Sequence, residues 1–269
     1  MGRNPVPRRT ERRCAMKRAL ATITLAGLLT AALVSPSKAE PMSISGEQDI
    51  GALMRTAGEI YDLENEDAVF LFKGRKEYWT PDGRRITMMH RITWLRTEYA
   101  INRYADLRIP WDSAHQTFRK TALRTWRDNK WIVSGPTAVV ETLPFAVDRA
   151  DDYTNMRETM LLHDGIELPC IIETAYVIED VEPYRDGASG VWTFPRGEPA
   201  VMVSFTLGVP AGSVPHYAVH GDIPRPVKGS DEERGLDTYT FTMNQVNALP
   251  RPRTDEMIRE VPRVTWSTW

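Results

Sequence analysis

Strict alternation of apolar and polar positions marks two stretches in the second half of the chain. At 201–209 the residues Val, Val, Phe, Leu and Val alternate with Met, Ser, Thr and Gly, and at 238–244 Tyr, Phe and Met alternate with Thr and Asn. Side chains two positions apart share one face of a strand. Each stretch therefore predicts a strand with one buried face. A less regular apolar stretch at 171–181 predicts a third strand.

Two hairpins are predicted earlier in the chain. The apolar runs 68–72 and 86–95 flank Pro81-Asp82-Gly83, whose glycine can adopt the positive φ of a turn. The runs 117–126 and 131–133 flank a polar connection of four residues, which suits a second hairpin.

Helical periodicity is found near the start of the chain. Ser45 to Gln48 has the spacing of a capping box, and apolar residues then recur at helical intervals at Ile50, Leu53, Met54, Ala57 and Tyr61. This pattern predicts one amphipathic helix over 46–61.

The fold class that these elements predict is mostly β, an antiparallel β-sandwich with one short N-terminal helix, because short strands follow one another without alternating helices. We expect an N-terminal helical segment at 40–62 and the sandwich at 63–250. Residues 221–237 are charged and contain two prolines, so we expect a mobile loop between the last two strands. Residues 251–269, polar and interrupted by prolines, are expected to form a C-terminal connector.

The first 39 residues carry the pattern of a secretory signal peptide. Lys17 and Arg18 precede an apolar run from Ala19 to Val34, and Ser37 and Ala39 fit the small-residue cleavage pattern. A membrane anchor is the alternative, but 16 uncharged residues fall short of the roughly 20 that a spanning helix needs. We therefore expect a periplasmic or secreted protein that is not an integral membrane protein after cleavage.

The start of translation is open between Met1 and Met16, and translation from Met16 would leave out Cys14. Cleavage after position 39 would remove eight basic residues and one acidic residue, which takes the formal net charge from −2 to −9. An acidic protein repels a phosphate backbone, so nucleic acid is not an expected partner.

The residues with catalytic chemistry do not form a complete set in the sequence. Cys170 is the one candidate nucleophile of the mature chain, and His163 and Asp164 could supply a base and its orienting partner. However, Cys170 begins a predicted strand, where a buried thiol is inert, and Asp164-Gly165 is typical of a turn. We assign no catalytic residues, no cofactor-binding residues and no cofactor.

Metal, hydrolytic and glycan sites have weaker support. His216, His220 and Asp222 would suit a metal on a helix, but the segment is predicted as a strand, on which residues four apart stand roughly 13 Å apart. No metal residues are assigned. The acidic clusters 64–67, 151–152 and 231–233 lie in predicted loops. Of eight tryptophans, Trp111 and Trp192 are the candidates for exposed platforms that could bind a glycan by stacking.

Five segments, in this order, resemble a bacterial domain of unknown function that precedes transglutaminase-like domains in exported proteins. They are 68–95, 104–112, 160–177, 191–212 and 261–269, and the resemblance covers about residues 62 to 269. The chain departs from the family at Leu168-Pro169-Cys170, where a glycine-led turn is usual. The resemblance implies a β-sandwich, an envelope location and no catalytic residues.

The segment 261–269 resembles the lead-in to a transglutaminase-like domain, so we expect that the catalytic domain is absent, in a natural stand-alone companion or a truncated form of a longer protein. The function expected is a non-catalytic accessory or interaction module that partners an envelope protein or a transglutaminase-like protein. A glycan- or peptide-binding module of the envelope is the alternative, and a cysteine enzyme using Cys170 is the third.

Overall fold

The computed structural model describes residues 49–147, 154–194, 197–248 and 261–269. The predicted signal peptide, both possible start residues and Asp151-Asp152 lie outside these ranges.

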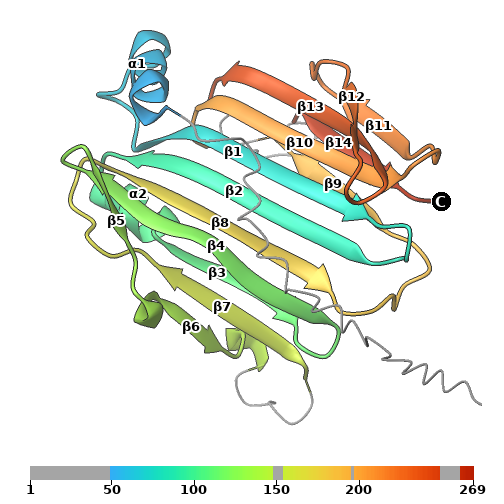
Figure 1. The fold of residues 1–269 in the computed structure, drawn as a ribbon. Coiled ribbons are helices and arrows are strands. Elements are labelled where there is room, and N and C mark those ends of the chain that lie inside the picture. Colours follow the sequence, from blue (N-terminus) through green and yellow to red (C-terminus); the bar gives the residue numbers. More distant parts are fainter. Residues whose placement is uncertain (1–48, 148–153, 195–196, 249–260) are drawn as a thin grey trace, which may run out of the picture. The chain divides into compact units, whose positions relative to one another are not determined.

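An eight-stranded sheet runs through the described chain (Figure 1) in the order β12-β13-β10-β1-β2-β8-β4-β5. All its neighbouring strands are antiparallel except β1 and β10, which run parallel. Its strands are β1 (Ala68–Trp79), β2 (Arg85–Leu95), β4 (Gln116–Arg127), β5 (Lys130–Val133), β8 (Cys170–Asp180), β10 (Ala200–Pro210), β12 (Val227–Asp231) and β13 (Leu236–Val246).

Two three-stranded sheets accompany the large sheet. One has the order β11-β14-β9, from β9 (Ser189–Thr193), β11 (His216–His220) and β14 (Arg263–Ser267). The other has the order β3-β7-β6, from β3 (Asp106–Asp112), β6 (Val139–Thr142) and β7 (Met156–Leu162). The helical elements are α1 (Ile50–Ile60), α2 (Glu98–Tyr104) and the short 3-10 turns Pro136–Ala138 and Phe145–Val147.

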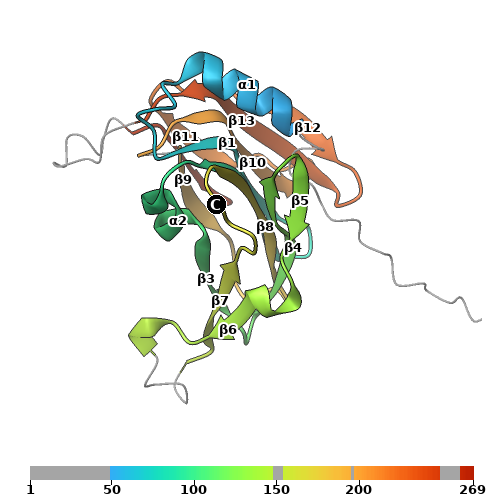
Figure 2. The same cartoon turned by 90° about the vertical axis from the view of Figure 1, so that its left-hand side faces the viewer.

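Both small sheets pack on one face of the large sheet, which we call the inner face. The Trp192 ring of β9 stacks on Phe205 of β10 at 6.0 Å between centroids, and Tyr217 of β11 meets Phe241 of β13 edge-on at 5.4 Å. Ile109 of β3 belongs to a second buried cluster with residues of β4 and β7. Figure 2 shows β3 and β7 in a layer separate from β4 and β8. This arrangement of stacked sheets confirms the predicted mostly β, antiparallel-rich class.

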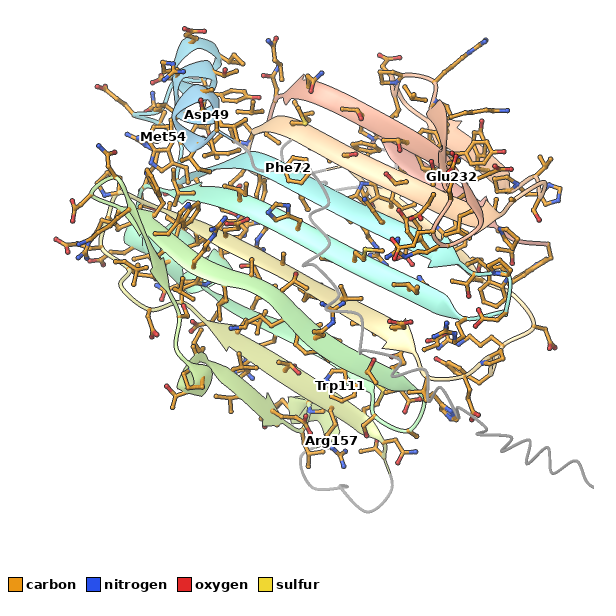
Figure 3. All side chains as sticks on the ribbon, viewed as in Figure 1. Asp49, Met54, Phe72, Trp111, Arg157 and Glu232 are labelled. Atoms are coloured by element: carbon orange, nitrogen blue, oxygen red, sulfur yellow. The ribbon has the colours of Figure 1, made fainter. Side chains whose placement is uncertain are left out.

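The opposite, outer face of the large sheet is covered at one end by α1. Met54 of α1 and Phe72 of β1, both labelled in Figure 3, belong to the same apolar cluster. The helix begins after Asp49, whose extended backbone caps it and whose side chain accepts a hydrogen bond from the Ala52 amide at 3.0 Å. The predicted start at residue 46 is therefore wrong, because Asp49 is not helical.

The predicted strands and hairpins are present, with different lengths. The turn before β2 has the predicted Gly83, with φ +82°. The second hairpin turns over two residues instead of four, because Asp128 and Asn129 both adopt positive φ, 51° and 57°. That geometry matches the right-handed twist of adjoining strands and permits the tighter turn.

Three expectations differ from the structure. A second helix, α2, is present with Thr97 as its cap. The expected loop 221–237 contains the edge strand β12, whose side chains are largely exposed and so show no apolar alternation. The described end of the expected connector contains β14, the central strand of its sheet, with Val264 and Trp266 buried. No helix among the described residues is long and apolar enough to cross a membrane.

Candidate functional site

The candidate nucleophile Cys170 is a buried core residue. It opens β8 opposite Leu95, and its side chain is 2% exposed as a free thiol. Burial raises its pKa above the usual value, so the unreactive thiol form dominates at neutral pH. This environment fits a packing role.

His163 has its hydrogen bonds satisfied without Cys170. Burial lowers the pKa of His163, which favours the neutral ring. Its Nδ1 lies 2.9 Å from the Ala105 carbonyl, and its Nε2 lies 3.1 Å from Thr174 Oγ1 and 3.3 Å from the Glu173 carbonyl. The carboxylate of Asp164 instead accepts from the Gly135 amide at 2.9 Å. Gly165 has φ +72°, as the predicted turn requires.

His216 and His220 lie at the two ends of β11, so the predicted strand is confirmed for this segment. They pair with Ser267 and Arg263 of β14, respectively. Within the described ranges, no three His, Cys, Asp or Glu side chains are grouped in a way that could hold a metal ion.

The two tryptophans expected as exposed platforms are both engaged in packing. Trp192 of β9 is 6% exposed, because its ring packs between β9 and the large sheet. Trp111 of β3, labelled in Figure 3, donates from Nε1 to Thr159 Oγ1 at 3.0 Å and lies against Phe118. Trp192 therefore has no free face that could stack on a sugar, whereas Trp111 stays partly exposed.

A polar hollow of about 470 Å³ opens on the outer face of the large sheet. It includes the acidic turn that follows β12, where Figure 3 labels Glu232. Serine and threonine hydroxyls of β10 and β13 line its floor together with Lys76 and Tyr78. Asp231, at its edge, pairs with Arg234 at 2.9 Å. The third acidic cluster, 64–67, lies in the turn before β1 as predicted.

A group of cations on the inner face, which we call the inner-face cluster, consists of Lys73 and Arg75 of β1 and Arg91 of β2, together with Trp192 of β9. Lys73 and Arg91 are direct cross-strand partners, and such partners project from the same face of a sheet. The Trp192 centroid lies 5.4 Å from Lys73 Nζ and 5.6 Å from Arg75 Cζ. The cluster therefore brings two cations, Lys73 and Arg75, against one indole, with Arg91 as the cross-strand neighbour of Lys73.

Aromatic rings also border the cluster on its other side. Lys73 Nζ lies 5.2 Å from the Phe70 centroid, and Arg91 Cζ lies 5.7 Å from the Tyr104 centroid. Phe70 and Tyr104 meet edge-on at 5.4 Å. Burial, followed by the charges of Arg91 and Arg75, lowers the pKa of Lys73 to about 8. The lysine thus keeps its proton at neutral pH in an apolar, positively charged environment.

Sequence reasoning did not identify this cluster, for a structural reason. A register shift in β1 between Phe70 and Phe72 changes which positions face inward. As a result the side chain of Phe72 lies on the outer face. The side chains of Phe70, Lys73 and Arg75 lie on the inner face, toward the small sheets. In the sequence alone, where the covering sheet is not known, Lys73 and Arg75 are indistinguishable from charged residues that face solvent.

Comparison with known proteins identifies a similar solved structure and the family of the chain. A crystal structure of a "putative protease from Parabacteroides distasonis ATCC 8503" matches with a TM-score of 0.68 and 20% sequence identity. The match covers 76% of this chain and 40% of that chain, so this chain spans less than half of that protein. No curated protein matches. The family described as "Domain of Unknown Function with solved-structure structure (DUF3857)" matches residues 81–250, more than half of the sequence, and the chain belongs to this family.

Proposed function

We propose that the chain is a non-catalytic accessory module of the bacterial envelope, associated with a transglutaminase-like protein. The observation that carries the proposal is family membership over residues 81–250. The same fold forms part of a longer protein described as a protease, which supports a module that works beside a catalytic one.

The environment of the candidate chemistry supports a non-enzymatic role. Cys170 is buried with a raised pKa, and both ring nitrogens of His163 contact backbone carbonyls or a threonine hydroxyl instead of the thiol. A thiol nucleophile needs the opposite arrangement, an accessible thiolate next to a base. The apolar run and small-residue site before Glu40 support export to the periplasm or beyond.

Crosslinking in the native envelope tests this proposal. A tagged full chain is expressed in its host, crosslinked in intact cells, purified by its tag and analysed by mass spectrometry. We expect a transglutaminase-like envelope protein to be enriched over a sample without crosslinker and over an unrelated tagged exported protein. Failure to enrich any such protein would contradict the accessory role. Enrichment of glycan or peptide fragments instead would support the binding-module alternative.

Export has its own readout. Cell fractionation and N-terminal sequencing of the processed chain should give Glu40 as the first residue. A chain found in the cytosol with its first 39 residues intact would contradict export.

A further inference from the structure

The inner-face cluster carries more positive charge than the carboxylates around it can neutralise. Both oxygens of the buried Glu77 are occupied, Oε1 by Arg75 and Oε2 by Arg85 Nε at 2.8 Å and Thr87 Oγ1 at 2.9 Å. Among the described residues, no carboxylate lies within ion-pair distance of Lys73 or Arg91. Two cations therefore face each other across β1 and β2 without an anion.

One oxygen of the second buried carboxylate nearby, Glu198, is also occupied. Glu198 Oε1 accepts from Arg103 Nη1 at 2.7 Å and from the Tyr104 hydroxyl at 2.5 Å. Arg91 reaches no side-chain oxygen and donates from Nη2 to the Tyr104 carbonyl at 2.8 Å. Like charges that face each other on neighbouring strands destabilise a sheet, and a partly buried cation without a counter-charge adds to that cost.

The hydrogen-bond groups left without partners at this place include two obligate donors. Arg91 Nε and Trp192 Nε1 are buried and have no hydrogen-bond acceptor in the described structure. Both nitrogens can only donate. Thr93 Oγ1, two residues along β2 from Arg91, is also buried without a partner. Native interiors leave few such groups unsatisfied, so donors that lack acceptors beside unpaired cations indicate a place for an acceptor with negative charge.

We propose that the inner-face cluster binds a small oxyanion, a carboxylate or phosphate group, held by Lys73 and Arg91 with Trp192 Nε1 as a neutral donor. Charge-assisted hydrogen bonds from an ammonium and a guanidinium suit either group. Arg75 borders the site with a side chain that is 29% exposed, so the cluster is not sealed from solvent. This proposal is independent of the accessory role.

Titration calorimetry on the full chain tests it, with sodium phosphate and sodium malonate as separate probes at constant ionic strength and sodium chloride as the reference. Intrinsic tryptophan fluorescence gives a second readout, because the indole of Trp192, one of the eight tryptophans, borders the site. We expect saturable binding of at least one probe, and the two arms distinguish phosphate from carboxylate chemistry.

Two matched substitutions on β1 make the test specific. Lys73→Met keeps an unbranched side chain of nearly the same length and removes its charge, and it should weaken binding at least tenfold. Lys76→Met removes a lysine from the opposite face of the same strand, beside the outer hollow, and should leave binding unchanged. Circular dichroism checks that both variants fold.

Two results would overturn the proposal. A response to both probes that equals the chloride response would show charge screening alone and would overturn the proposal. Equal binding by the wild-type and Lys73→Met proteins would overturn it as well. If Lys73→Met fails to fold, Arg91→Lys provides the second variant, since it keeps the charge but removes the Nε donor and should still weaken binding measurably.

Discussion

Glu173 is a buried carboxylate on the outer face of the large sheet, and its pKa ties stability to pH. Its Oε1 lies 2.8 Å from His90 Nε2, and its Oε2 accepts from Arg124. Burial alone would raise its pKa, but the hydrogen bonds and charges of His90 and Arg124 outweigh burial and lower it below the usual 4.5. Arg124 in turn stacks on Trp131 at 4.0 Å, so the carboxylate fixes both partners.

We predict that Glu173→Gln lowers the free energy of unfolding by about 1.5–3 kcal/mol at pH 7, because it removes charged hydrogen bonds in a buried place. The folded-state pKa lies below the unfolded value, so this stabilisation is complete above pH 4.5 and is lost as pH falls through the folded value. Urea unfolding at a series of pH values below 7 measures this. The free energy of unfolding of Glu173→Gln should fall less steeply with decreasing pH than that of the wild type.

Glu179→Gln provides the matched control for this substitution. Glu179 lies on the same strand, β8, and pairs with Arg84 while 36% exposed. Exposed pairs contribute about 0–1 kcal/mol, so this variant should unfold close to the wild type. Equal effects of the two substitutions would contradict the role assigned to Glu173.

The thiol of Cys170 should not react with alkylating reagents in the native protein. Its 2% exposure and its raised pKa both restrict the thiolate that reacts with electrophiles. We predict negligible labelling by iodoacetamide at pH 7.5 in buffer and full labelling in urea, measured by mass spectrometry of the peptide that contains Cys170. Rapid native labelling would favour the cysteine-enzyme hypothesis over the accessory role.

The hairpin of β4 and β5 shows how one turn sets the geometry of an element. Asp128 and Asn129 both have left-handed φ, which costs a residue with a Cβ about 1–2 kcal/mol, less for Asn and Asp than for others. We predict that Asn129→Gly is neutral or stabilising and that Asn129→Ala destabilises by about 1 kcal/mol. Thermal unfolding of the two variants checks this, and a more stable alanine variant would contradict the turn assignment.

The elements that the sequence predicted and those that it missed differ in how they are buried. Strands β10 and β13 place their apolar side chains on one face, so the apolar alternation is visible along the chain. The edge strand β12 is held by backbone pairing to β13 while its side chains stay largely exposed, which leaves no pattern to read. Strand β14 did carry a signal, the alternation of Val264 and Trp266, but it is short and follows a proline.

The inner-face cluster could not be predicted for a different reason. Its cations are assembled by the cross-strand register of β1 and β2 and by a tryptophan from a separate sheet. Local patterns carry neither the register nor the identity of the covering sheet. The buried position of Cys170, in contrast, followed from its place at the start of an apolar strand.

At the level of the whole domain, the last described residues close the main core. Trp266 of β14 is 5% exposed in the cluster that contains Trp192, Phe205 and Phe241. Its indole also lies so close to Gly190 of β9 that a Cβ at that glycine would be 2.9 Å from Trp266 Nε1. Strand β14 is thus a structural part of the sandwich, where a C-terminal connector over 251–269 had been expected.

We predict that Trp266→Ala lowers the free energy of unfolding by about 3–5 kcal/mol, the usual cost of deleting a buried large aromatic side chain. Trp269→Ala is the matched control, because that ring is 68% exposed and such surface changes usually stay within about 0.5 kcal/mol. Urea unfolding followed by far-ultraviolet circular dichroism measures both. If the two variants unfolded alike, β14 would contribute little to the core, and the original connector interpretation of this segment would regain support.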